Sequence, residues 1–128
     1  MSRAVLDTSV FIASEHGRPL ERSLPADVAV SVVTFAELEV GVLVAQDEEV
    51  RATRIQTLVM ARERAHGLPA DQPVASAYAR LAAGELQRGR RPRVNDTWIA
   101  ATAAVHGAAV WTQDDDFTEF EGIEVVRV

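Results

Sequence analysis

Five acidic residues of this chain stand where predicted strands end or predicted helices begin. They are Asp7, Glu37, Asp96, Asp114 and Asp116. Carboxylates that gather in one place repel one another by several kcal/mol for a close pair at an effective dielectric of about 20, unless they are protonated or a cation neutralises them. Hard oxygen ligands favour Mg²⁺ or Mn²⁺, and such an ion activates water and neutralises the charge on a phosphate. The residue types therefore predict metal-dependent phosphoryl hydrolysis.

Each acid also has a purely structural explanation. Asp7 could cap the helix that follows it, Thr34 and Glu37 match a capping box, and Asp96 precedes another helix that it could cap. The run Asp114 to Asp116 could begin a final turn. For any single acid the structural explanation is at least as good as the chemical one, so the placement of the acids must decide.

The elements that must position these acids alternate between strands and helices. Apolar, β-branched runs predict strands over residues 4–6, 28–33, 108–112 and 123–128. Helical patterns cover residues 10–14, 34–46, 47–66, 74–87 and 95–106. Strands separated by helices predict an α/β fold with parallel pairing and helices on both faces of the sheet.

The predicted topology brings the acids to one edge of that sheet. In an open parallel sheet, ligands bind beyond the carboxyl ends of the strands, which is where Asp7 and Asp114 fall. Asp96 begins the helix that leads into the strand before Asp114, and Glu37 is expected in the first turn of the helix after residues 28–33. We therefore expect four acids from distant parts of the chain to converge.

Composition narrows the class of protein. The chain has 128 residues, a formal net charge of −6 and no cysteine, and all 13 basic residues are arginine. The charge argues against a nonspecific nucleic-acid-coating protein, and the missing cysteine excludes thiolate chemistry. No apolar run is long enough to span a membrane and the N-terminus does not read as a signal peptide, so we expect a single cytoplasmic domain over residues 1–128.

Two other acid-bearing α/β folds do not fit these residues. A receiver domain needs a lysine, and the sequence has none. A haloacid-dehalogenase-like phosphatase would use Asp7 as its nucleophile, but the second acid of its DxD motif is replaced here by Ser9.

Four segments in order resemble the acidic motifs of the PIN-domain ribonucleases, specifically the VapC toxins of bacterial toxin–antitoxin pairs. The segments are VLDTSVFIA, SVVTFAELEVGV, NDTWIAATA and VWTQDDDF, and together they span nearly the whole chain. The resemblance implies a three-layer PIN-like fold, in which helices flank a central, mainly parallel sheet of four or five strands. Each motif alone is weak, whereas four in the same order are specific.

The resemblance also implies roles for individual residues. The catalytic acids would be Asp7, Glu37, Asp96 and Asp114. The ligands of Mg²⁺, or of Mn²⁺ as a substitute, would be Asp7, Asp96, Asp114 and Asp116, while Asp115 should face solvent. Ser9 and Thr112 would hydrogen-bond the carboxylates or a metal-bound water.

By the same resemblance the substrate would be single-stranded or looped RNA, cut to leave a 5′-phosphate. A cognate VapB-type antitoxin would inhibit the protein with its C-terminal segment, and a homodimer within a higher toxin–antitoxin assembly is expected. The alternative function is a catalytically silent domain of the same fold that acts as an RNA-binding or protein-interaction module.

The arginines before Asp96 could contact RNA phosphates, because a guanidinium suits bidentate phosphate contacts. We place these contacts at Arg91 and Arg93, with a solvated helix end as the equally good alternative for any one arginine. Trp98 and Trp111 could stack on bases, but core packing is the better interpretation of both.

Overall fold

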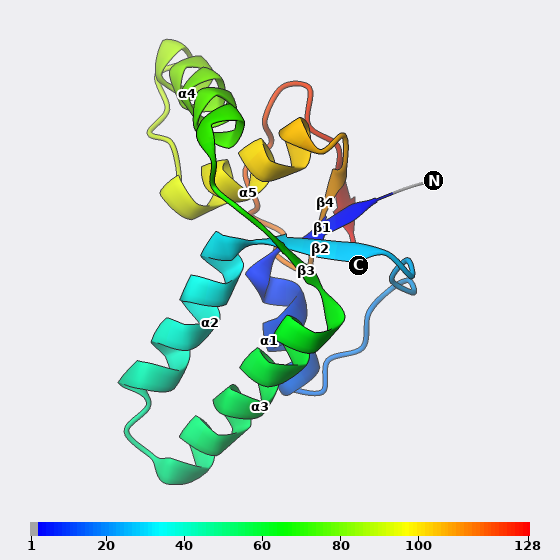
Figure 1. The fold of residues 1–128 in the computed structure, drawn as a ribbon. Coiled ribbons are helices and arrows are strands. Elements are labelled where there is room, and N and C mark those ends of the chain that lie inside the picture. Colours follow the sequence, from blue (N-terminus) through cyan, green and yellow to red (C-terminus); the bar gives the residue numbers. More distant parts are fainter. Residues whose placement is uncertain (1–2) are drawn as a thin grey trace.

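The computed structural model describes residues 3–128 and contains a five-stranded sheet between two layers of helices (Figure 1). The strands are β1 (Ala4–Leu6), β2 (Val28–Ser31), β3 (His66–Leu68), β4 (Ala109–Thr112) and β5 (Val125–Arg127). Their order across the sheet is β3-β2-β1-β4-β5, and every neighbouring pair is parallel. The predicted three-layer α/β fold with a parallel sheet is confirmed.

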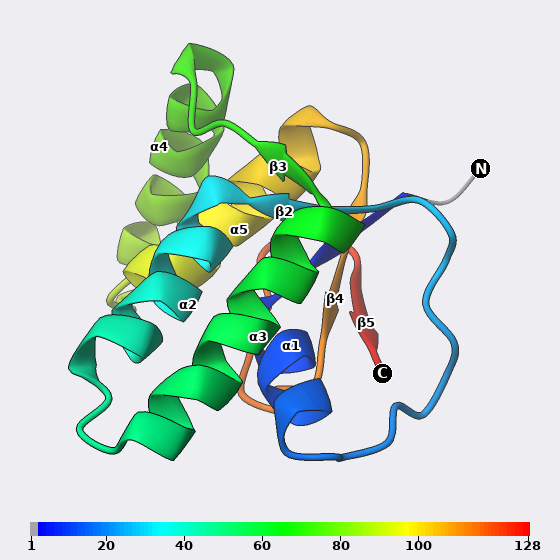
Figure 2. The same ribbon diagram turned by 60° about the horizontal axis from the view of Figure 1, so that its bottom comes forward.

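The helices divide between the two faces of this sheet. They are α1 (Thr8–Glu15), α2 (Val32–Val44), α3 (Glu48–Arg64), α4 (Gln72–Gln87) and α5 (Val94–Val105). Figures 1 and 2 show α1, α2 and α3 on one face and α5 on the other, with α4 lying against α5. None of the helices in the described part of the chain is long and apolar enough to cross a membrane.

Strand β1 is the central strand of the sheet, and its side chains pack into the apolar clusters on both faces. Ala4 and Leu6 belong to the apolar cluster beneath α1 and α3, whereas Val5 belongs to the cluster beneath α5, because successive side chains of a strand point to opposite faces. All three are 1% exposed. The residue that follows this buried strand is consequently held in a fixed position, and that residue is Asp7.

Strand β3 was not among the strands predicted individually. The predicted helix over residues 47–66 ends at Arg64, and His66 to Leu68 instead pair with Ala29 to Ser31 of β2. A three-residue edge strand containing glycine has no pattern of its own, and its pairing partner lies more than thirty residues away in the sequence.

The end of the predicted strand over residues 28–33 was also wrong. β2 ends at Ser31, whose hydroxyl accepts a hydrogen bond from the backbone N–H of Val33 at 3.1 Å and caps α2. Helix α2 therefore begins at Val32 rather than Thr34. The capping box suggested for Thr34 and Glu37 is absent, and Glu37 lies in the second turn rather than the first.

Candidate functional site

The pairing of β1 with β4 places Asp7 beside the end of β4. Leu6 lies opposite Trp111 in the register, and the backbone N–H of Asp7 donates to the carbonyl of Trp111 at 2.8 Å. Asp7 occupies the N-cap position of α1, but its side chain makes no capping hydrogen bond. The structural explanation offered for this acid therefore does not account for its carboxylate, which is only 7% exposed as a residue.

Two hydroxyl groups hold one oxygen of the Asp7 carboxylate. Ser9 Oγ donates to Asp7 Oδ2 at 2.7 Å, and Thr112 Oγ1 donates to the same oxygen at 2.8 Å. Each hydroxyl is itself fixed by the chain after β4, because Gln113 N donates to Ser9 Oγ and Asp114 N donates to Thr112 Oγ1, both at 2.9 Å. Ser9 and Thr112, which the family resemblance expects to hydrogen-bond the acids or a metal-bound water, thus both hydrogen-bond Asp7.

The electrostatic environment disfavours the charged form of Asp7. Burial raises the pKa of the Asp7 carboxyl above its ordinary value, and the negative charge of Asp96 raises it further. Hydrogen bonds from Ser9 and Thr112 act in the opposite direction without cancelling the effect of burial.

The three consecutive aspartates after β4 have different surroundings. Asp114 is half-buried, and its Oδ1 accepts a hydrogen bond from the backbone N–H of Asp116 at 2.8 Å. Asp115 has a side chain 97% exposed that pairs with Arg127, in agreement with its predicted direction toward solvent. Asp116 is also exposed, so Asp114 is the only one of these three aspartates that is partly buried.

Asp96 lies in the first turn of α5, where Arg93 rather than Asp96 occupies the N-cap position. One carboxylate oxygen, Oδ2, accepts two hydrogen bonds from Thr118, at 3.1 Å from its backbone N–H and at 2.9 Å from its hydroxyl. The side chain of Asp96 is therefore held by the loop after β4, and the suggestion that it caps α5 is wrong.

Glu37 reaches the same region from α2. Its Oε1 accepts a hydrogen bond at 2.7 Å from the hydroxyl of Thr8, the residue next to Asp7, and that hydroxyl lies 3.3 Å from Thr34 Oγ1. Glu39, two positions further along α2, points elsewhere and pairs with Arg62. Thr8 thus joins Glu37 to the segment that carries Asp7.

These four acids share one arrangement. Within residues 3–128, one carboxylate oxygen of each acid accepts hydrogen bonds from hydroxyl or backbone N–H groups, and the other oxygen has no side-chain partner. No arginine of this part of the chain forms an ion pair with any of the four. The engaged oxygens are Oδ2 of Asp7, Oε1 of Glu37, Oδ2 of Asp96 and Oδ1 of Asp114. Hard oxygens that are oriented but left without a cation suit Mg²⁺ or Mn²⁺.

The acids do not form a closed cage. Among the described residues, no three acids or histidines are grouped closely enough to hold a metal ion by themselves. Mg²⁺ commonly keeps several waters and binds through one or two carboxylates together with substrate phosphates. An open set of oxygens fits that mode of binding better than a site that encloses the ion.

Three hydroxyl residues of this site were not found from the sequence: Thr8, Thr34 and Thr118. Thr8 and Thr34 lie inside the motif segments, so their positions offered a weak signal. Thr118 lies 22 positions after Asp96 in a loop, and only the folded chain brings the two together.

Most arginines of the loop before α5 already have partners within the protein. Arg88 and Arg90 both pair with Glu85, which is 3% exposed, and Arg88 also pairs with Glu121. Arg93 donates to the backbone carbonyl of Asp116 at 2.9 Å. Arg91 is exposed and makes no ion pair or side-chain hydrogen bond with the rest of the described chain, which leaves its guanidinium available.

Both tryptophans pack against the protein, as predicted. Trp98 stacks on Tyr78 between α5 and α4, with ring centroids 4.3 Å apart. Trp111 is half-buried against the core, and the guanidinium of Arg22 lies 5.9 Å from its ring centroid.

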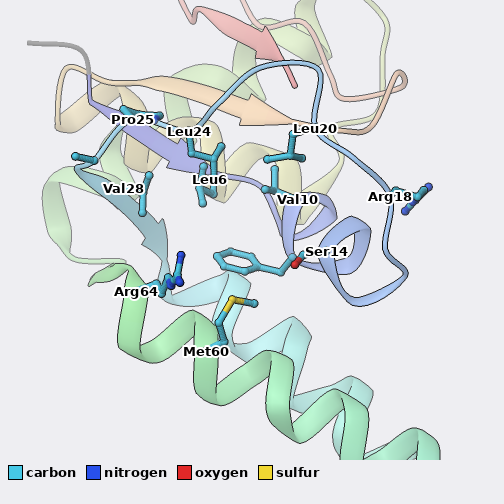
Figure 3. A pocket seen from close by; sticks show the side chains of 12 residues that line it. Leu6, Val10, Ser14, Arg18, Leu20, Leu24, Pro25, Val28, Met60 and Arg64 are labelled. Atoms are coloured by element: carbon cyan, nitrogen blue, oxygen red, sulfur yellow. The ribbon is translucent and has the colours of Figure 1, made fainter.

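A cavity of about 400 Å³ lies away from these acids, under the loop that joins α1 to β2 (Figure 3). Its walls are mainly apolar and include Val10, Leu24 and Met60, with Arg18 and Arg64 as its charged residues. No carboxylate of residues 3–128 lines it. The cavity therefore lacks the groups needed for the chemistry that the acids suggest.

Comparison with known proteins agrees with this architecture. The family model described as PIN domain matches residues 4–123. The chain is 49% identical to Ribonuclease VapC5 of Mycobacterium tuberculosis, over 97% of this chain and 94% of that protein. It is 41% identical to Ribonuclease VapC4 of the same organism, over 98% and 97%.

A solved structure gives the same result. The chain superimposes with a TM-score of 0.88 and 45% identity on a chain from the crystal structure of VapBC-5, a member of the VapBC family of toxin–antitoxin systems from Mycobacterium tuberculosis, with 100% of both chains covered. This chain belongs to the PIN domain family and, within it, to the VapC group.

Proposed function

We propose that the protein is a metal-dependent endoribonuclease that acts as the toxin of a toxin–antitoxin pair. The observation that carries this proposal is the arrangement of Asp7, Glu37, Asp96 and Asp114, each with one oxygen held by hydrogen bonds and a second oxygen that has no side-chain partner within residues 3–128. The names of the relatives VapC5 and VapC4, both called ribonucleases, support RNA as the substrate.

The cofactor in this proposal is Mg²⁺, with Mn²⁺ as a substitute. Asp7, Asp96 and Asp114, with Asp116 from the loop after β4, would contribute its ligands directly or through its bound waters, since no three acids of residues 3–128 are grouped closely enough to hold the ion by themselves. When bound, such an ion lowers the pKa of a coordinated water and neutralises charge on the phosphate that is attacked. Because the second oxygens of the acids have no side-chain partner within residues 3–128, they could meet the ion or its waters while the hydrogen bonds that position each carboxylate stay in place.

The side chains contribute orientation and charge. Ser9 and Thr112 keep Asp7 Oδ2 occupied, so that Oδ1 is the oxygen presented to a ligand. Thr8 holds Glu37 through Oε1 and leaves Oε2 to accept a hydrogen bond from the attacking water. Hydrolysis of the phosphodiester would then leave a 5′-phosphate on the released fragment.

Arg91 and Arg93 would bind the RNA backbone next to this site. Arg91 is the stronger candidate because its guanidinium makes no ion pair or side-chain hydrogen bond within residues 3–128, whereas Arg93 also supports the carbonyl of Asp116. The overall charge of −6 makes a local cationic contact necessary, since the molecule as a whole repels RNA.

A VapB-type antitoxin is the proposed protein partner. Support comes from VapBC-5, which is described as a member of a family of toxin–antitoxin systems and matches this chain over its whole length. We propose that the antitoxin inhibits the protein by covering the acids, and that the toxin forms a homodimer within the assembly.

Cleavage of RNA by the purified protein tests this function. We expect Mg²⁺ or Mn²⁺ to support cutting of single-stranded RNA and EDTA to stop it. Asp7→Ala and Asp96→Asn are expected to abolish cutting while circular dichroism stays unchanged.

The aspartate run after β4 offers a matched pair of variants. Asp114→Asn is expected to abolish cutting, whereas Asp115→Asn, at an exposed neighbour that pairs with Arg127, is expected to leave it intact. RNA binding without any metal-dependent cutting would instead identify the protein as a silent RNA-binding module. Equal activity of the Asp96→Asn variant and the parent would contradict the assignment of the site.

A further inference from the structure

We infer that Thr118 is a positioning residue, which orients the carboxylate of Asp96 for metal binding. This inference rests on the proposed function, because it concerns how one acid of that site is held. Thr118 donates twice to Asp96 Oδ2, from its backbone N–H at 3.1 Å and from its hydroxyl at 2.9 Å. These are the only side-chain hydrogen bonds that Asp96 makes within residues 3–128, so Thr118 alone sets the rotation of this carboxylate.

The loop that carries Thr118 is itself fixed. Phe117 is 3% exposed and inserts into the apolar cluster beneath α5, and its backbone N–H donates to the carbonyl of Asp114 at 3.2 Å. Arg93, at the start of α5, donates to the carbonyl of Asp116 at 2.9 Å. Two contacts, Arg93 to Asp116 and Asp96 to Thr118, thus join the N-cap and first turn of α5 to this loop.

The consequence for Asp96 is that its two oxygens become inequivalent. Two donors occupy Oδ2, whereas Oδ1 has no side-chain partner in the described chain. Removal of the Thr118 hydroxyl would leave one donor, and the carboxylate could then rotate or turn its oxygens toward solvent. Partners that orient a metal-binding side chain typically change metal affinity by 10- to 100-fold when they are lost.

Thr118 differs in one respect from the other hydroxyl residues of the site. Ser9 and Thr8 lie on α1, and Thr112 ends β4, so regular structure fixes them. Thr118 lies in an irregular segment, and its contact couples Asp96 to the loop that also contains Asp114. Loss of the hydroxyl is therefore expected to affect metal binding more than it affects folding.

The experiment measures Mn²⁺ affinity by calorimetry, without RNA, for the parent protein and three variants. Thr118→Val removes the hydroxyl at nearly constant volume, and Thr118→Ser restores it. Thr53→Val is the matched control, because the Thr53 hydroxyl donates only to the carbonyl of Glu49 within α3. We expect Thr118→Val to weaken Mn²⁺ binding by about 10- to 100-fold, Thr118→Ser to stay within about threefold of the parent, and Thr53→Val to match the parent.

Thermal unfolding of the same variants in EDTA separates positioning from folding. If Thr118→Val weakens Mn²⁺ binding and Thr118→Ser does not, at similar metal-free stability, the positioning role holds. If the parent binds Mn²⁺ and cuts RNA while Thr118→Val binds Mn²⁺ equally well, the positioning role is wrong and the proposed function stands. If the parent neither binds Mn²⁺ nor cuts RNA, both are wrong.

Discussion

Thr112 Oγ1 lies 2.8 Å from Asp7 Oδ2, although the two residues are 105 positions apart in the sequence. The same hydroxyl accepts a hydrogen bond from the backbone N–H of Asp114 at 2.9 Å. One fully buried threonine therefore links the acid after β1 to the acid after β4. The contact exists because β1 and β4 are neighbours in the sheet and their carboxyl ends meet at one edge.

Thr112→Val is expected to destabilise the protein by about 1 to 3 kcal/mol, the usual cost of leaving buried polar groups without partners. Valine keeps the shape of threonine but offers neither the donor to Asp7 nor the acceptor for Asp114. The measurement is urea unfolding in EDTA, with Thr112→Ser as the control that keeps the hydroxyl. A change below roughly 0.5 kcal/mol for Thr112→Val, the range of ordinary surface substitutions, would contradict the linking role.

The raised pKa of Asp7 predicts how the stability of the metal-free protein depends on pH. Because the pKa is higher in the folded than in the unfolded chain, the folded protein binds more protons at this group. The stability that this group contributes is fully present below the unfolded value, near 3.8, and is lost as pH rises through the folded pKa. Above that value an ionised, buried Asp7 destabilises the fold.

Asp7→Asn isolates this effect, since asparagine keeps an oxygen for Ser9 and Thr112 but does not titrate. We expect the free energy of unfolding of Asp7→Asn, relative to the parent in EDTA, to rise as pH increases from 4 toward neutrality. The rise is about 1.4 kcal/mol for each unit by which the folded pKa exceeds the unfolded one. A difference between the two proteins that does not change with pH would show that the pKa of Asp7 is not raised.

The sequence predicted most of the fold, and it placed Asp7 and Asp114 at strand ends, because both depend on short, local patterns. The run Ala4 to Leu6 ends one residue before Asp7, and the run Ala109 to Thr112 ends two residues before Asp114, so each acid can be placed from its own neighbours. The predicted end of β2 was wrong because it also relied only on local residue types. Val32 and Val33 favour a strand by residue type, but the Ser31 hydroxyl caps a helix there, and the cap prevails over β-propensity.

The contacts that orient the acids could not be predicted in this way. Thr118 and Asp96 come together only when Phe117 packs beneath α5, and Thr8 meets Glu37 only when α1 and α2 lie side by side. Strand β3 likewise depends on a partner strand rather than on its own residues. Long-range packing, which no local pattern encodes, therefore decides the geometry of the site.

Gly67 in β3 provides a test of that packing. A Cβ atom at Gly67 would lie 2.6 Å from Cε2 of Phe35, whose ring packs against the core, so Phe35 would have to move. We expect Gly67→Ala to destabilise the protein by about 1 to 3 kcal/mol, as overpacking typically does. The measurement is chemical denaturation.

Gly84 in α4 is the matched control for this substitution. A Cβ atom there would meet nothing within 4 Å, and alanine favours a helix over glycine by up to about 1 kcal/mol. Gly84→Ala is therefore expected to be neutral or stabilising. If both substitutions changed stability by the same amount and sign, the close approach of β3 to Phe35 would not be a feature of the folded protein.

Arg91 and Arg93 are predicted to differ, although both precede Asp96 and both are exposed. Arg91 makes no ion pair or side-chain hydrogen bond with the rest of residues 3–128, so Arg91→Ala is expected to leave stability unchanged. It should weaken RNA binding and make the slope of the logarithm of the binding constant against the logarithm of salt concentration shallower by about one. Arg93→Ala also removes the hydrogen bond to the Asp116 carbonyl, so it is expected to lower stability by about 0.5 to 1.5 kcal/mol.

Fluorescence anisotropy with labelled single-stranded RNA, in an Asp96→Asn background that prevents cutting, measures the binding. Arg3→Ala is the control, because Arg3 lies at the amino end of β1, pairs with Asp27 and is at the sheet edge opposite the acids. Since a phosphate contact is electrostatic, the effect of Arg91→Ala must shrink as salt concentration rises, whereas a loss of structure would persist at every salt concentration. Equal weakening by Arg3→Ala and Arg91→Ala would mean that RNA responds to the net charge of the protein rather than to this loop.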